Sequence, residues 1–167
     1  MIVNTISQPE ESAGAPLQCP TKPPCRILVV EDDYDLCQVN ARTLIYSGYA
    51  VDAVEDGAAA WEALQANRYD LVITDNNMPR LTGIELLKKL YATRMVLPVI
   101  MATGTLPKEE FTRYPWLQPV AMLLKPYSVE ELLGTVKEVL RATVSACEQI
   151  ASPPNWRSQP SADGLRT

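Results

Sequence analysis

The strongest constraint on the fold is a regular alternation of short apolar runs with amphipathic segments through the middle of the chain. The expected strands cover residues 26–30, 50–54, 71–74, 99–102 and 122–124, and the expected helices cover 36–46, 57–67, 83–91, 108–113 and 128–142. Strands that are almost wholly apolar and alternate with helices are typical of a parallel sheet covered on both faces. The pattern therefore predicts an α/β fold of the doubly wound, flavodoxin-like (βα)5 type, with strand order 2-1-3-4-5.

Several local signals mark where these helices begin and end. Asp33 is placed to begin or cap the first helix, and Gly48 is a plausible stop for it. Ser128 and Glu131 have the spacing of a capping box at the start of the last helix. Pro115 has to end or distort the short helix before it.

The two ends of the chain differ in composition from its middle. Residues 1–24 and 145–167 are rich in Pro, Ser and Gly and lack a periodic apolar pattern. We expect a flexible leader over residues 1–24, one domain over 25–144 and a flexible tail over 145–167. No second domain is expected after the last helix.

Composition argues against several functional classes. The 20 acidic residues outnumber the 15 basic ones and the pI is about 4.8, which disfavours direct DNA binding. No apolar stretch approaches the roughly 20 residues that span a bilayer, so a cytoplasmic protein with no membrane contact is expected. The chain has no His, and its four Cys lack paired CxxC spacing, so free thiols are expected in place of a zinc site.

Charged residues follow three of the expected strands. Glu31 and Asp32 follow the first strand, Asp75 follows the third, and Lys125 follows the fifth. The carboxyl ends of parallel strands lie at one edge of a sheet, so these groups are expected to converge. Three crowded carboxylates resist ionisation unless a cation joins them, and oxygen ligands suit Mg²⁺. The sequence thus predicts a magnesium-dependent phosphoryl site.

Four motifs in this order, VVEDD, ITDNNMPRLTG, MATG and LLKP, resemble those of the receiver domain of bacterial two-component response regulators. The resemblance covers about residues 25–142 and is to the single-domain, chemotaxis-regulator-like members. The resemblance implies that Asp75 is the phosphoacceptor, that Glu31 and Asp32 are the acidic pair holding Mg²⁺ (or Mn²⁺), and that Asn77 supplies a backbone carbonyl to the metal. It further implies that Thr103 is the switch hydroxyl and that Lys125 contacts the phosphoryl group. The family often has a cis peptide bond between that lysine and the following proline.

Because no second domain is expected after the last helix, we expect a stand-alone regulator, and the resemblance places it in phosphorelay signal transduction. A sensor histidine kinase or a histidine phosphotransfer protein would donate the phosphoryl group, and a downstream protein would bind the switched surface. The chain would not be an enzyme beyond its own aspartyl phosphorylation and dephosphorylation. A monomer or weak dimer is expected.

The chain departs from the family pattern in its expected output region. Met122 stands three residues before the lysine, where receivers often carry Tyr or Phe, so the usual aromatic readout is in doubt. Trp116 lies in the segment 114–117, which is either core packing or an exposed partner-binding patch.

Three alternatives remain at this point. A phosphohydrolase of the haloacid dehalogenase type normally needs a second acid where this chain has Asn77. A flavodoxin-like cofactor carrier would need a Ser, Thr or Gly-rich phosphate loop where this chain has an acidic triplet. A pseudo-receiver, which binds partners without phosphorylation, is the main alternative within the fold.

Overall fold

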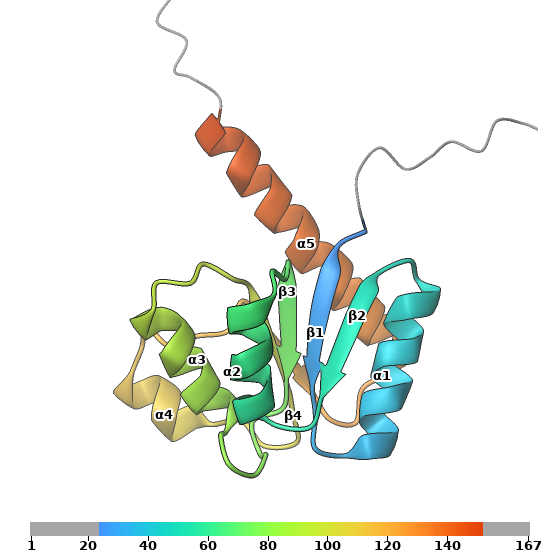
Figure 1. The fold of residues 1–167 in the computed structure, drawn as a ribbon. Coiled ribbons are helices and arrows are strands. Elements are labelled where there is room, and N and C mark those ends of the chain that lie inside the picture. Colours follow the sequence, from blue (N-terminus) through green and yellow to red (C-terminus); the bar gives the residue numbers. More distant parts are fainter. Residues whose placement is uncertain (1–23, 152–167) are drawn as a thin grey trace, which may run out of the picture.

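The computed structural model describes residues 24–151. It contains five strands and five helices in strict alternation (Figure 1). Their bounds are β1 Arg26–Val30, α1 Tyr34–Tyr46, β2 Ala50–Val54, α2 Gly57–Ala66, β3 Leu71–Thr74, α3 Gly83–Ala92, β4 Val99–Thr103, α4 Lys108–Arg113, β5 Ala121–Leu124 and α5 Val129–Ala151.

The strands form one parallel sheet in the order β2-β1-β3-β4-β5, which confirms the predicted fold. The buried strand residues alternate between two hydrophobic clusters because successive side chains point to opposite faces. Leu28 and Val72 pack with α2 and α3, whereas Ile27 and Ile73 pack with α1 and α5. The sheet is therefore the middle layer between two layers of helices (Figure 1).

The predicted caps are present. The Asp33 carboxylate accepts a hydrogen bond from the backbone N–H of Leu36, and Ser128 and Glu131 form the reciprocal bonds of a capping box. Thr82 and Glu85 form a second capping box at the start of α3, and α4 ends at Arg113, just before Pro115. Local signals thus set these helix ends.

The last helix is longer than predicted. It runs to Ala151, so the expected helix end near residue 142 and the expected domain end at residue 144 both fall inside it. No Gly or Pro occurs between Gly134 and Pro153, and residues such as Ala, Val and Glu can continue a helix without packing against the sheet. In Figure 1 the final turns of α5 project past the sheet.

Several predictions concern the ends of the chain. Residues 1–23 and 152–167 of the predicted leader and tail lie outside the described residues. Cys25 and Cys37 are free thiols, as expected, while the side chains of Cys19 and Cys147 lie outside the described part. Within residues 24–151, no helix combines the length and apolarity needed to cross a membrane.

Candidate functional site

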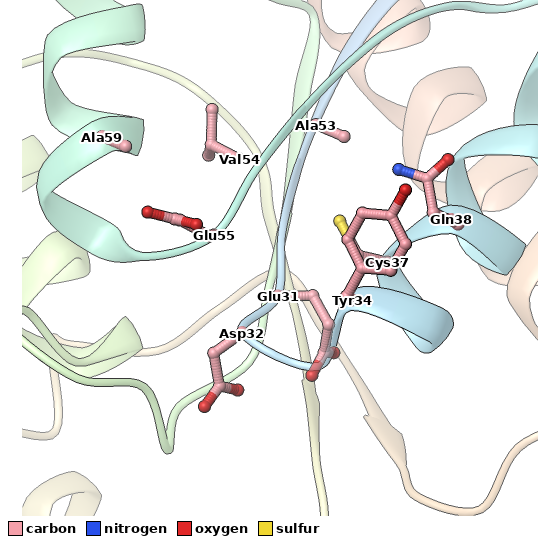
Figure 2. A pocket seen from close by; sticks show the side chains of 9 residues that line it. All are labelled: Glu31, Asp32, Tyr34, Cys37, Gln38, Ala53, Val54, Glu55 and Ala59. Atoms are coloured by element: carbon pink, nitrogen blue, oxygen red, sulfur yellow. The ribbon is translucent and has the colours of Figure 1, made fainter.

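The carboxyl edge of the sheet brings three acidic side chains together. Glu31 and Asp32 directly follow β1, and Asp75 directly follows the neighbouring strand β3. One carboxylate oxygen from each lies within 4.8 Å of the others. Figure 2 shows Glu31 and Asp32 at the end of β1, beside a cavity that Cys37 borders on the α1 side and Glu55 on the α2 side.

Lys125 joins this cluster from the end of β5. Its Nζ donates to Asp75 Oδ2 at 2.6 Å and to the two oxygens of Glu31 at 2.7 and 2.8 Å. The Glu31 and Asp75 side chains are almost fully buried, whereas Asp32 is exposed. The Lys125–Pro126 peptide bond is cis. One ammonium thus reaches carboxylates from two strands.

Burial and charge act in opposite senses on this cluster. Burial raises the pKa of Glu31 despite the opposing effect of Lys125, and the nearby Asp75 adds to the rise. Burial alone would lower the pKa of Lys125, but its hydrogen bonds to Asp75 and Glu31 outweigh burial and raise it. The lysine therefore stays charged, while the single positive charge leaves Glu31 incompletely compensated.

The charge balance of the site fits a divalent cation. When all three carboxylates are ionised, one ammonium leaves a surplus of two negative charges within a few ångströms. Clustered carboxylate oxygens are ligands that Mg²⁺ and Mn²⁺ prefer, and partial exposure at Asp32 suits an ion that retains water. The donor set is thus compatible with the predicted metal.

The loop after β3 holds Asp75 by backbone groups. The backbone N–H groups of Asn76 and Asn77 both donate to Asp75 Oδ1, the second at 3.1 Å. The Asn76 side chain accepts from the N–H of Ile84 at 3.1 Å and so ties the loop to the start of α3. Oδ1 is therefore fixed by the protein, and Oδ2 is the oxygen that Lys125 contacts. The assigned role of the Asn77 carbonyl stays a prediction.

Thr103 lies at the end of β4 and is fully buried. Its hydroxyl donates to the backbone carbonyl of Thr105 at 3.2 Å. The hydroxyl is thus engaged within its own loop, while the strand order places β4 between β3 and β5, the strands that precede Asp75 and Lys125. Its role as a switch stays a prediction.

The two residues singled out for output lie on the surface of the domain. Met122 in β5 is 38% exposed and Trp116 is 54% exposed. The Trp116 ring makes edge contacts with Tyr91 and Tyr114, while the next residue, Leu117, is fully buried. The segment 114–117 therefore combines both alternatives, because Leu117 packs in the core and Trp116 is open to solvent.

Two polar contacts near the site were missed in the sequence. Asn40 in α1 is buried and its side-chain amide donates to the Tyr127 hydroxyl at 2.9 Å, beside the loop that carries Lys125. Asp56, also buried, contacts the guanidinium of Arg80. Asn40 could have been noticed as a polar residue on the apolar stripe of a helix, but its partner is 87 residues away.

The fold and the site together define a class: doubly wound α/β proteins with an acidic cluster and a lysine at the carboxyl edge of a parallel sheet. The model of the response regulator receiver domain matches residues 27–137. The chain belongs to this family.

Similar proteins agree with this assignment. The response regulator MprA of Mycobacterium sp. (strain KMS) is 38% identical over 122 residues, which are 72% of this chain and 52% of that protein. The structure of the Vibrio cholerae chemotaxis protein CheY4 is similar with a TM-score of 0.64 and 30% identity, over 70% of this chain and 98% of that one.

A second similar structure contains a metal. The response regulator protein TrrA from Thermotoga maritima, in complex with Mg²⁺ and BeF, has a TM-score of 0.59 and 27% identity over 68% of this chain and 97% of that one. The sequence match to MprA covers only part of that protein, since this chain spans about half the length of MprA.

Proposed function

We propose that this chain is a receiver that accepts a phosphoryl group on Asp75 from a phosphohistidine of a sensor kinase or phosphotransfer protein. The N–P bond of the donor breaks as an O–P bond to the Asp75 carboxylate forms, and hydrolysis by water later restores the carboxylate. The observation that carries the proposal is the contact of Lys125 Nζ with Asp75 Oδ2 at 2.6 Å, inside a cluster of three carboxylates.

Asp75 is suited to the role of nucleophile. Its Oδ1 accepts two backbone hydrogen bonds, which fix the carboxylate and leave Oδ2 facing the lysine. Lys125 carries a compact positive charge with three rotatable N–H donors. Its ammonium can therefore replace a contact to a carboxylate oxygen by a contact to an oxygen of the transferred phosphoryl group. Thr103 would contact another phosphoryl oxygen after giving up its bond to Thr105.

Glu31, Asp32, Asp75 and the Asn77 carbonyl would hold Mg²⁺ or Mn²⁺. When bound, the metal neutralises charge on the phosphoryl oxygens. The acidic pair binds the cation, and the loop after β3 orients the nucleophile. The protein would catalyse no reaction besides its own phosphorylation and dephosphorylation.

The proposed setting is cytoplasmic phosphorelay signalling through a downstream protein, without direct DNA binding and as a monomer or weak dimer. Residues 25–144 would carry this activity. The acidic pI of about 4.8 supports a protein target over DNA.

Intact-mass analysis after acetyl phosphate treatment tests the proposal. We expect one labile phosphate with Mg²⁺ and none after chelation or in Asp75→Asn. Undiminished labelling of Asp75→Asn would contradict the assignment of Asp75. Failure of the wild-type chain to label would favour the pseudo-receiver alternative.

A further inference from the structure

We propose that Arg80 is a positioning residue for the metal site: by pairing with the buried Asp56, it locks the loop after β3 to the start of α2. The inference rests on the proposed function, because it concerns the metal that this function requires. Arg80 itself is 60% exposed and is not assigned as a ligand.

The Asp56 side chain has no exposed surface, and its two oxygens have different partners. Oδ1 caps α2 by accepting from the backbone N–H groups of Ala58 and Ala59 at 2.7 and 2.9 Å. Oδ2 has no hydrogen-bond partner of regular geometry among the described residues, and the Arg80 guanidinium contacts it. A buried carboxylate needs a countercharge. The helix cap provides hydrogen bonds to Oδ1 only, so the Arg80 guanidinium compensates the negative charge at Oδ2.

Arg80 makes a second ion pair on the same side. Its guanidinium lies 2.9 Å from Glu55 Oε1, and Glu55 borders the cavity that also contains Glu31 and Asp32 (Figure 2). Arg80 therefore contacts two consecutive residues of the loop between β2 and α2.

Backbone packing supports the same connection. A Cβ placed on Gly57 would collide with the carbonyl oxygen of Leu81, the residue after Arg80. The loop after β3 thus lies directly on the first residue of α2, at a distance that only glycine allows. The ion pair and this contact join the same two segments.

The backbone of Arg80 is unusual for its residue type. Its φ is 66°, in the left-handed region that non-glycine residues rarely adopt. This conformation places the Arg80 side chain where its guanidinium contacts both Asp56 and Glu55.

The locked loop is the one that holds the nucleophile. Three to four residues before Arg80, the N–H groups of Asn76 and Asn77 bind Asp75 Oδ1. The Asn77 carbonyl is the proposed metal ligand on this loop. Since supporting contacts of this kind set the orientation of metal ligands, release of Arg80 is expected to weaken cation binding.

The test compares Arg80→Gly with Arg94→Gly. Glycine accepts a positive φ at both positions, and Arg94 has a φ of 55° without an ion pair among the described residues. Binding of Mn²⁺ alone is measured by electron paramagnetic resonance of the free ion. We expect Arg80→Gly to raise the Kd about tenfold and Arg94→Gly to leave it unchanged.

The sign of this effect separates positioning from simple electrostatics. Loss of a positive charge beside carboxylates would by itself tighten cation binding. A weaker Kd in Arg80→Gly therefore supports positioning, and an unchanged or tighter Kd overturns it.

A double-mutant cycle tests the pair itself. Asp56→Asn keeps the capping oxygen and removes the charge, so it should raise the Mn²⁺ Kd as Arg80→Gly does, and the double variant should be no weaker than the worse single one. Effects that multiply would show that the residues act independently. Amide exchange of residues 76–82 in the metal-free variants should accelerate, whether or not Asp75 accepts phosphate.

Discussion

Lys125 Nζ lies 2.6 Å from Asp75 Oδ2, and the same nitrogen contacts Glu31 Oε2 at 2.7 Å. One ammonium thereby connects the ends of β5, β3 and β1, which are distant in sequence and neighbours or near neighbours in the sheet. This arrangement lets the lysine balance part of the acidic cluster while contacting the carboxylate proposed to accept the phosphoryl group.

Replacement of Lys125 by Met should separate metal binding from phosphoryl transfer. Removal of the ammonium increases the negative charge, so the Mg²⁺ Kd measured by calorimetry should fall. Phosphorylation at saturating Mg²⁺ should slow about a hundredfold, because a group that stabilises developing charge is lost. A weaker metal affinity in this variant would mean that the lysine helps to build the site.

Alanine at Gly83 should destabilise the domain by about 1–3 kcal/mol, because its Cβ would collide with the backbone carbonyl of Asp75. The control is Gly134→Ala in α5, where a Cβ meets nothing within 4 Å. That substitution should stabilise by about 0.5–1 kcal/mol. Urea unfolding measures both, and equal effects of the two variants would contradict the packing argument.

Tyr69 should make stability depend on alkaline pH. Burial, followed by its hydrogen bond to Asp52, raises the pKa of Tyr69 from 10 to about 12. A raised folded-state pKa means that the stabilisation is complete below pH 10 and is lost as pH rises toward 12. Tyr69→Phe should lack this loss.

The measurement is the free energy of unfolding in urea at several pH values between about 9 and 12. Tyr46→Phe is the control, because Tyr46 is 90% exposed. Parallel pH profiles for wild type and Tyr69→Phe would refute the assignment.

Beryllofluoride, a stable phosphoryl mimic, should change the environment of Trp116. If Thr103 moves toward the phosphoryl group, the backbone from residue 104 to 117 has to adjust, and α4, which has no buried residue, offers little resistance. Trp116 fluorescence or amide exchange over residues 108–117 measures this response. Met122→Ala should leave it largely intact, because a flexible thioether can repack. Abolition of the response by Met122→Ala would place the switch at β5 instead.

The sequence alone determined the order and type of the elements, because strand-like and helical periodicities alternate and Asp33, Ser128 and Glu131 act on nearby backbone groups. It also indicated the convergence of Glu31, Asp32, Asp75 and Lys125, since a parallel sheet places strand ends together. The end of α5 was misplaced because the composition of residues 145–167 as a whole, with its Pro and Ser, was taken for the end of the helix, whereas no Gly or Pro interrupts the chain before Pro153 and the helix continues to Ala151.

Other polar pairs around the site could be identified only once the folded arrangement was known. The contact of Asp56 with Arg80 joins residues 24 positions apart, and the hydrogen bond of Asn40 with Tyr127 joins residues 87 apart. No local pattern encodes such pairs, because they depend on how loops from different strands meet after the sheet has formed. The half-exposed position of Trp116 beside the buried Leu117 has the same origin, since packing of α3 against the irregular segment after α4 determines it.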